Sequence, residues 1–359
     1  MNRTNHNMSE WQVRDGNEMD MGGILSLREI VFREEERDKL DPRFWRWEFI
    51  ENPDGRASIY IVEDQRKIIA HFADIPRRFS VGGEAVLGTL SLDLMVHPDY
   101  WRKGIFQAMG KYAIQRVKND NCFFMSSYPI RRETINGFKK IGWRKMVKLP
   151  VVVYPINFSG VINRYLRFQP LSLLIGGVAR FFYFLLHGLK RKKRTGEAEI
   201  EKVDLLDDAF NGFWQKASTL YPILGIRDQN YLNWRYLRHP TRTYSIYRAK
   251  ISGEMKGYII LRKVKLLNFD STVIVDLLAL DEATLIGLVE KGIEHSRAER
   301  TDLLGFMVPL DHLYYKILRR MGFLPSLKTF LFMVYPHSGK EILLSPEKWY
   351  VNWGDTDVI

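Results

Sequence analysis

Apolar residues recur along the first 155 positions at two spacings, one typical of strands and one typical of amphipathic helices. Strand spacing is found at 11–14, 58–63, 67–79, 122–127 and 146–154, and in a long run that ends at Val96. Helical spacing is found at 19–32, 103–117 and 132–141, and in a helix that begins at Pro42 behind Asp41. Strands and helices that alternate in this way predict an α/β (α+β) fold built around one mixed sheet.

The sequence repeats itself with small changes in spacing. Trp47 matches Trp234 at an offset of 187 residues, and Asp93 matches Asp276 at an offset of 183. Offsets that drift by only a few residues across a whole domain indicate a duplication with small loop deletions. We therefore predict two tandem mixed-sheet units. The predicted boundaries are 1–155 for the first unit, 156–197 for an apolar helical linker, 198–337 for the second unit and 338–359 for a C-terminal tail.

Composition excludes several kinds of site. The one cysteine, Cys122, rules out a disulfide framework or a thiolate metal site within the chain. The eight histidines show no pairing at metal-ligand spacing, so we expect no metal. Residues 1–20 are polar and lack the apolar core of a signal peptide, which indicates a cytoplasmic protein.

The net charge of +12 is concentrated between the two units. Residues 156–196 carry eight Lys or Arg and no Asp or Glu, whereas a nucleic-acid binder usually spreads its basic residues over a folded face, so we expect no nucleic-acid partner. The stretch 171–189 is mostly apolar, and 190–194 are all Lys or Arg. One interpretation is an interfacial helix, with 171–194 in peripheral contact with an anionic membrane. The other is a helical hairpin buried between the units.

Residues 90–106 carry the clearest chemical signal. An apolar strand ends before Pro98, and a basic turn with Gly104 precedes a helix. The first turn of a helix has unpaired backbone N–H groups and a positive dipole end, which together bind anions. Gly104 has no side chain to obstruct a phosphate, and Arg102 and Lys103 add positive charge. The pattern fits an anion site, and it also fits an ordinary turn between a strand and a helix.

This stretch resembles the pyrophosphate loop of the GCN5-related N-acetyltransferase (GNAT) superfamily. The family's loop has the pattern Gln/Arg-x-x-Gly-x-Gly/Ala after a Val-x-Pro strand end, and this chain has Trp-Arg-Lys-Gly-Ile-Phe at 101–106 after Val-His-Pro at 96–98. The central glycine matches, whereas Trp101 and Phe106 depart from the pattern. The resemblance implies acyl-CoA, such as acetyl-CoA, as co-substrate. It assigns the pyrophosphate to Arg102, Lys103, Gly104, Ile105 and Phe106, and the pantetheine arm to Leu94, Met95 and Val96.

The family also has a later signature, Tyr-x-x-x-Gly-Phe, whose tyrosine protonates the leaving thiolate. The residue at that position here is Phe138, which has no proton to give. Tyr128 is the alternative acid, because the ordinary pKa of tyrosine is closer to that of a thiol than the pKa of a nearby serine. The other interpretation of Tyr128, which we favour, is a loop aromatic that packs on the sheet.

Asp93 is the candidate general base. Strict alternation along the strand puts Ser91, Asp93, Met95 and His97 on one face, opposite Leu90, Leu92, Leu94 and Val96. A carboxylate on that face could relay a proton from an amine through water. The second unit keeps Asp276, so a structural role for Asp93 is an equal alternative. His97, whose ordinary pKa is near neutrality, is a third candidate.

The second unit lacks the basic glycine turn. After Asp276 the chain carries Asp281 and Glu282, which would repel a phosphate. We predict that this unit is a non-catalytic copy that completes a substrate groove or covers a sheet edge.

Three functions remain open. The first hypothesis is an N-acyltransferase that moves an acetyl or similar group from coenzyme A to a primary amine by direct attack in a ternary complex. The amine would belong to a small molecule or a glycan, for example an amino sugar of a surface glycan. The second is an aminoacyl transferase resembling the Fem family, also a tandem GNAT fold, which uses aminoacyl-tRNA. The third is an inactive GNAT-fold binding protein, which Trp101, Phe106 and Phe138 favour. The oligomeric state is open.

Overall fold

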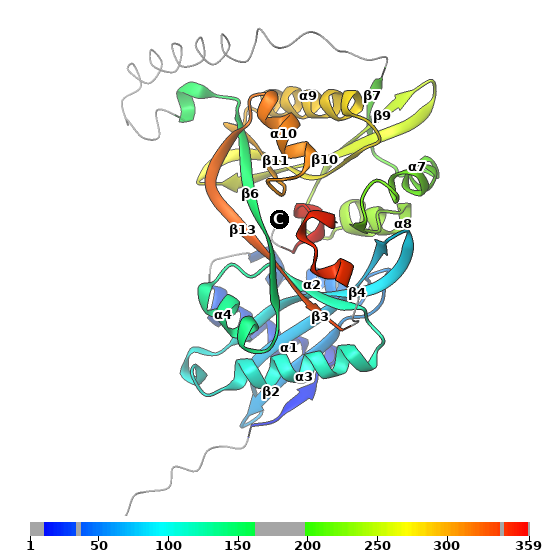
Figure 1. Ribbon diagram of the computed structural model, residues 1–359. Helices are drawn as coiled ribbons and strands as arrows, with labels where there is room; N and C mark the ends of the chain where they lie inside the picture. The colour runs from blue at the N-terminus through cyan, green and yellow to red at the C-terminus, as the bar shows by residue number, and fades with distance from the viewer. Residues whose placement is uncertain (1–10, 34–36, 162–197, 338–340, 358–359) are drawn as a thin grey trace, which may run out of the picture.

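The computed structural model describes residues 11–33, 37–161, 198–337 and 341–357 of the chain. Figure 1 shows two lobes, with β6 (Arg144–Pro155) and β13 (Leu324–Pro336) running side by side between them. The predicted membrane-contact segment 171–194 lies outside the described residues. Among the described helices, none is long and apolar enough to cross a membrane.

The first half contains the elements that the sequence pattern predicts. Its other strands are β1 (Val13–Asp15), β2 (Ser58–Asp64), β3 (Lys67–Val81), β4 (Glu84–Val96) and β5 (Phe124–Ser127). Its helices are α1 (Met21–Phe32), α2 (Pro42–Phe49), α3 (Ile105–Asn119) and α4 (Arg132–Lys140), with 3-10 turns η1 (Glu18–Asp20), η2 (Arg37–Leu40) and η3 (Pro98–Tyr100). The predicted ends agree with the observed ones to within two residues.

The second half repeats this order of elements. Its other strands are β7 (Glu199–Val203), β8 (Ile223–Gly225), β9 (Ser245–Ile251), β10 (Glu254–Leu266), β11 (Phe269–Ala279), β12 (Leu303–Met307) and β14 (Trp349–Tyr350). Its helices are α7 (Ala209–Ala217), α8 (Gln229–Leu232), the π-helical turn η4 (Asn233–Leu237), α9 (Glu282–Ala298) and α10 (Leu313–Arg320). The chain then forms the 3-10 turns η5 (Glu341–Leu344), η6 (Pro346–Lys348) and η7 (Trp353–Asp355).

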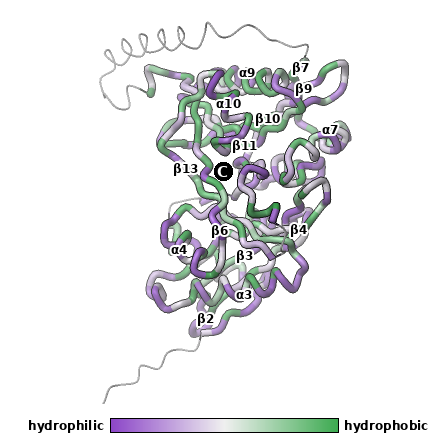
Figure 2. The backbone as a smooth tube through the Cα atoms, viewed as in Figure 1, coloured by the Kyte–Doolittle hydropathy of each residue, from purple (hydrophilic) through white to green (hydrophobic). Residues whose placement is uncertain are grey.

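The described strands form one mixed sheet whose main order is β1-β2-β3-β4-β5-β13-β6-β12-β11-β10-β9-β7, with β8 paired to β3 and β14 paired to β8. The last strand of each half is exchanged, because β13 pairs with β5 and β6 pairs with β12. Figure 2 shows hydrophobic residues along β6 and β13, interrupted by hydrophilic ones. The predicted α/β (α+β) mixed-sheet fold is confirmed. The strand order is the same on either side of the β13–β6 pair, as a duplication would give, while the duplication and its boundaries stay predictions.

A β-bulge at Asp93 changes which side chains of β4 share a face. Asp93 has a φ of +53°, and the register with β3 shifts between the pairs His71↔Met95 and Ala73↔Leu92. Leu92 and Met95 consequently pack in the same core, against α1 and α2. The predicted strict alternation is wrong beyond the bulge, because the extra residue turns the following side chains to the other face.

The sheet of the first half has a core on each face. Leu94 and Val96 pack on the face opposite to Leu92, beside Ile105 and Met109 of α3. The helices α1 and α2 therefore cover one face, and α3 and α4 cover the other. The bulge in β4 lies between these two cores.

The two halves meet at a pair of tryptophans. Trp47 of α2 and Trp234 of η4 stack with their ring centroids 4.6 Å apart and 15° between their planes. Each indole N–H donates to the backbone carbonyl of the other residue, at 2.9 Å from Trp47 Nε1 and 3.1 Å from Trp234 Nε1. The sequence repeat aligns these two residues, so the contact is reciprocal and joins equivalent positions of the halves.

Candidate functional site

Strand β4 separates from β5 at Leu90. The two strands pair in parallel only at Thr89↔Met125 and Leu90↔Ser126, although β4 continues to Val96. Beyond Leu90, none of the described strands pairs with β4 on its β5 side. A strand edge of this kind has free N–H and C=O groups that can pair with an extended ligand.

Leu94, Met95 and Val96, which the resemblance assigns to the pantetheine arm, lie in this unpaired stretch. The side chain of Met95 is buried in the core, so only its backbone can face a ligand. One carbonyl already has a partner, because Trp101 Nε1 donates to Val96 O at 2.8 Å. Trp101 is 58% exposed, so its indole can leave this carbonyl without disturbing the core.

The turn after β4 ends at Gly104, which has a φ of +82° and is the N-cap of α3. No side chain caps this helix, and apart from its chain neighbours no atom lies within 4 Å of where a Cβ of residue 104 would be. Arg102 has a φ of +63°, and Lys103 Nζ lies 4.4 Å from the centroid of the Tyr100 ring. The turn therefore offers free N–H groups and positive charge at the end of the open β4 edge.

Ile105 and Phe106 have their side chains packed away from the turn. Ile105 is buried in the core beneath α3. The ring of Phe106 lies 5.6 Å from that of Phe138 and covers Gly137 of α4, where a Cβ would come within 2.4 Å of it. The departure from the family pattern at residue 106 therefore fills the contact between α3 and α4 and leaves the turn open.

Asp93 forms a buried ion pair. Its Oδ2 lies 2.5 Å from Nη1 of Arg28 on α1. Burial alone would raise the pKa of Asp93, but the nearby positive charges, first Arg28 and then Lys39, together outweigh burial and lower the pKa to about 2. His71 Nδ1 lies 2.9 Å from the backbone carbonyl of Asp93 and holds the bulge. At neutral pH Asp93 is the ionised partner of Arg28, which supports the structural alternative for this residue.

Tyr128 and His97 also have structural contacts. Tyr128 is buried, and its ring centroid lies 5.1 Å from that of Phe332 on β13. Burial raises the pKa of Tyr128 well above its ordinary value, so it keeps its proton. His97 precedes η3, and its Nδ1 accepts from the N–H of Asp99 at 3.4 Å. Catalytic roles for Tyr128 and His97 stay predictions.

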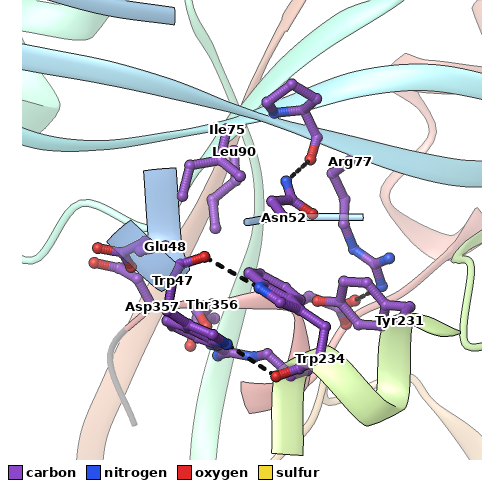
Figure 3. Close-up of a pocket in the computed structure, with 13 residues that line it drawn as sticks. Trp47, Glu48, Asn52, Ile75, Arg77, Leu90, Tyr231, Trp234, Thr356 and Asp357 are labelled. Carbon is purple, nitrogen blue, oxygen red and sulfur yellow. Dashed lines mark hydrogen bonds and ion pairs between the residues drawn. The ribbon is translucent and has the colours of Figure 1, made fainter. Parts of the chain in front are cut away.

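A pocket lies between α2 and the second half (Figure 3). The pocket is small, with about 30 Å³ that a water-sized group can occupy, and Trp47 and Glu48 line it together with Ile75 and Leu90 of the sheet. The second half contributes residues of α8, η4 and the C-terminal segment 355–357. Because Leu90 is the last residue of β4 that pairs with β5, the pocket reaches the point where the free edge of β4 begins.

Several buried polar atoms of pocket residues have no hydrogen-bond partner within the described part of the chain. They are Arg77 Nη2, Arg77 Nε, Arg235 Nε and Asp355 Oδ1. Arg77 Nη2 and Asp355 Oδ1 are 3.9 Å apart, too far for a hydrogen bond. Buried polar groups usually have partners, so this pocket is suited to a polar ligand.

Glu48 is a buried carboxyl in this pocket, only 3% exposed. It makes no hydrogen bond or ion pair with any residue in the described ranges, whereas Asp93 pairs with Arg28, and Asp357 Oδ2 lies 3.0 Å from Lys39 Nζ. Burial raises the pKa of Glu48 to about 7, an effect that Lys39 opposes and Asp93 reinforces. Glu48 therefore changes its protonation state near neutral pH.

The equivalent opening in the second half is filled by the protein's own side chains. Strand β11 pairs with β12 only as far as Ile274, and among the described strands it has no partner on that side up to Ala279. The hydroxyl of Tyr314 accepts from the N–H of Ala279 at 3.0 Å, and the hydroxyl of Tyr350 donates to the carbonyl of Leu277. An extended ligand would have to displace both tyrosines.

The start of α9 is also closed to anions. Asp281 caps it by accepting from the N–H of Thr284 at 2.8 Å, so a carboxylate lies where Gly104 lies in the first half. Asp276 is buried and accepts from Arg227 Nε at 3.0 Å and from Tyr258 at 3.1 Å. This geometry supports the prediction that the second unit is a non-catalytic copy.

Sequence analysis missed Glu48 and the charged residues that surround it. Their proximity depends on the tertiary fold, since Lys39 and Asp357 lie at opposite ends of the chain. The repeat did contain one signal. It aligns Trp47-Glu48 with Trp234-Arg235, so one position that lines the pocket reverses its charge between the halves.

The comparisons with known proteins agree with this geometry. Residues 12–146 match the family model of the acetyltransferase (GNAT) domain. A GCN5-related N-acetyltransferase from Anabaena variabilis has a TM-score of 0.65 at 14% identity, over 92% of this chain and 73% of that one. A probable N-acyltransferase of unknown function from Enterococcus faecalis has a TM-score of 0.64 at 12% identity, over 91% and 73%.

A third structure with the same fold is the N-myristoyltransferase of Saccharomyces cerevisiae, solved with bound myristoyl-CoA and inhibitors. Its TM-score is 0.60 at 10% identity, over 95% of this chain and 86% of that one. No curated protein matches the chain in sequence. Identities this low show a common fold and leave the substrate open. Residues 12–146, which hold the open β4 edge and the Gly104 turn, are therefore similar to the acetyltransferase (GNAT) domain family, and the chain as a whole shares its fold with GCN5-related N-acetyltransferases.

Proposed function

We propose that the chain is an acyl-CoA-dependent N-acyltransferase that transfers an acetyl or similar group to a primary amine. The observation that carries the proposal is the unpaired edge of β4, which ends at the open Gly104 turn. An extended pantetheine arm can pair with such an edge, and a pyrophosphate can bind the N–H groups and positive charges of the turn. The yeast neighbour solved with myristoyl-CoA supports an acyl-CoA as donor.

Direct attack of the amine on the acyl group fits the side chains at hand. Cys122, the one cysteine, is buried, and burial raises the pKa of its thiol to about 11, so it is a poor acyl-carrying nucleophile. The pocket beside Leu90 supports this mechanism, because an amino group bound there would lie next to the free β4 edge. A ternary complex of chain, acyl-CoA and amine then requires no covalent intermediate on the protein.

The cofactor test is calorimetry with acetyl-CoA. We expect one site per chain, and we expect Gly104→Asp to abolish it, because the substitution adds a side chain and a negative charge to a turn with positive φ. Gly253→Asp is the matched control, since Gly253 has a φ of +78° and equally open surroundings in the β9–β10 turn. Two equal sites, or full binding by Gly104→Asp, would contradict the proposal.

The acceptor test is thiol release with a panel of acyl-CoA donors and primary amines. The panel includes amino sugars, because an amino sugar of a surface glycan is our proposed acceptor. Release that depends on both substrates separates an enzyme from a binding protein and identifies the acyl group. Transfer from aminoacyl-tRNA in the absence of acyl-CoA would establish the Fem-like alternative instead.

A further inference from the structure

We propose that Glu48 takes the proton that the acceptor amine must lose, and that the amino group of the acceptor enters the pocket of Figure 3. The inference rests on the proposed N-acyltransferase function and adds to it a residue outside the coenzyme A motif. It follows from the position of Glu48, from the pairing of the charges around it and from the chemistry of amine acylation.

Helix α2 fixes the position of Glu48. Asp41 caps the helix by accepting from the N–H of Arg43 at 2.8 Å, and Pro42 opens its first turn. Three aromatic side chains next to Glu48 in α2 are buried: Trp45, Trp47 and Phe49. Figure 3 shows the carboxyl of Glu48 beside that of Asp357, with Leu90 and Ile75 on the sheet side of the pocket. An amine in this pocket therefore lies between Glu48 and the start of the free β4 edge.

The groups that face Glu48 come from every element packed around it. They are Arg28 of α1, Lys39 of η2, Asp93 of β4, Arg235 of η4 and Asp357 of the C-terminal segment, together with His71 of β3, which contacts Asp93. Arg28 and Lys39 each pair with a carboxylate other than Glu48. Burial lowers the pKa of His71, so at neutral pH its ring carries no charge. Glu48 is consequently the carboxyl in this group that can gain or lose a proton without breaking an ion pair.

The step balances with the proposed substrates alone. A primary amine arrives as an ammonium ion, and the ionised carboxylate of Glu48 takes one of its protons. The nitrogen lone pair then forms a bond to the carbonyl carbon of the thioester, and the bond from carbon to sulfur breaks. The thiolate leaves with the second proton that nitrogen loses as it becomes an amide. Glu48 finally returns its proton to water. A base works best when its pKa lies near the working pH, which the burial of Glu48 provides.

The second half contains no counterpart of this base. The position equivalent to Glu48 is Arg235, whose Nη2 donates to the backbone carbonyl of Thr356. Arg235 therefore holds the C-terminal segment that closes the pocket, while Glu48 faces the same pocket from the other half. This pocket is therefore lined by a carboxyl group from the first half and a guanidinium group from the second.

The experiment compares wild type, Glu48→Gln, Glu48→Asp and Glu51→Gln in the full chain. Glutamine keeps the shape of Glu48 but cannot accept the proton, so we expect transfer at pH 7 to fall about 10² to 10⁴-fold while calorimetric binding of acetyl-CoA is unchanged. Wild-type kcat/KM should show an inflection near pH 7 that Glu48→Gln lacks and Glu48→Asp keeps. Glu51 is exposed just beyond the same helix, so Glu51→Gln should match wild type.

Each outcome decides one of the two proposals. If wild type neither binds acetyl-CoA nor acylates any amine, the proposed function fails. If wild type transfers and folded Glu48→Gln transfers equally well, or keeps the inflection, the assignment of Glu48 alone is overturned. Should Glu48→Gln not fold, the wild-type and Glu48→Asp profiles still decide, because a wild-type profile without an inflection near pH 7 excludes Glu48 as the base.

Discussion

Replacing Glu48 with glutamine should make the protein more stable at alkaline pH, although it should lower transfer. Burial raises the pKa of Glu48 from its ordinary value of 4.5 to about 7. Each pKa unit corresponds to 1.36 kcal/mol, so this displacement amounts to about 3 kcal/mol. Glutamine avoids this cost because it never ionises. Active sites commonly contain residues that destabilise the fold but are needed for the reaction.

Whether the free energy of unfolding rises or falls with pH depends on which state, folded or unfolded, holds the Glu48 proton. Between pH 4.5 and about 7 the folded protein keeps the Glu48 proton while the unfolded chain has lost it. The free energy of unfolding therefore falls as pH rises through this interval, and it stays lower above pH 7. Glu48→Gln removes this fall. The difference between the variant and wild type should be small at pH 5 and reach about 3 kcal/mol at pH 8.

Denaturant unfolding at pH 5 and pH 8 measures this difference, with Glu51→Gln as control. Other buried groups also titrate in the interval, notably Asp74, whose pKa burial raises to about 7. They act equally on wild type and variant, so the comparison cancels them. A wild type that is the more stable protein at pH 8, or a difference that does not change with pH, would show that Glu48 is ionised and partnered in the fold.

Three further outcomes test other parts of the molecule. Asp93→Asn should lower the free energy of unfolding by on the order of 3 kcal/mol, because Arg28 loses a buried partner, yet leave transfer per folded molecule near normal. Denaturant unfolding and activity assays measure both, and lost activity at full stability would restore Asp93 as the base. Trp101→Phe should tighten acetyl-CoA binding up to about tenfold in calorimetry, since its indole no longer holds the Val96 carbonyl. Weaker binding would mean that the indole itself contacts the coenzyme. Neutral residues at 190–194 should release the protein from anionic vesicles, and salt should do the same; equal vesicle flotation of both proteins would exclude the membrane contact.

The sequence predicted the elements of the first half well because each depends on local spacing. Pro42 behind Asp41 located the start of α2, and the glycine turn located the start of α3. The prediction failed where one residue breaks the spacing. Asp93 adopts a φ of +53° and forms a bulge. The spacing of apolar residues does not predict where a single residue adopts such a conformation.

Only part of the candidate site could be predicted from the sequence, for a different reason. The proposed coenzyme A motif is a continuous stretch, so its residues could be found in the sequence. The proposed base depends on contacts between distant segments, since Glu48 gains its properties from burial and from neighbours such as Asp93 and Asp357. Tyr314 and Tyr350, which fill the equivalent opening beside β11 in the second half, likewise reach it only through the tertiary fold.

The exchanged strands have a consequence for how the protein is made. Strand β6 pairs only with β12 and β13 among the described strands, and both belong to the second half. During synthesis β6 (144–155) leaves the ribosome long before β13 (324–336). Until β13 is made, the sheet of the first half is incomplete and β5 has an unpaired edge. Open strand edges invite pairing with other chains, and domains otherwise tend to fold in order as they are synthesised. In this chain the sheet of the first half is completed only when β13 emerges, near the end of synthesis. The chain is therefore most exposed to aggregation in the interval before β13 emerges.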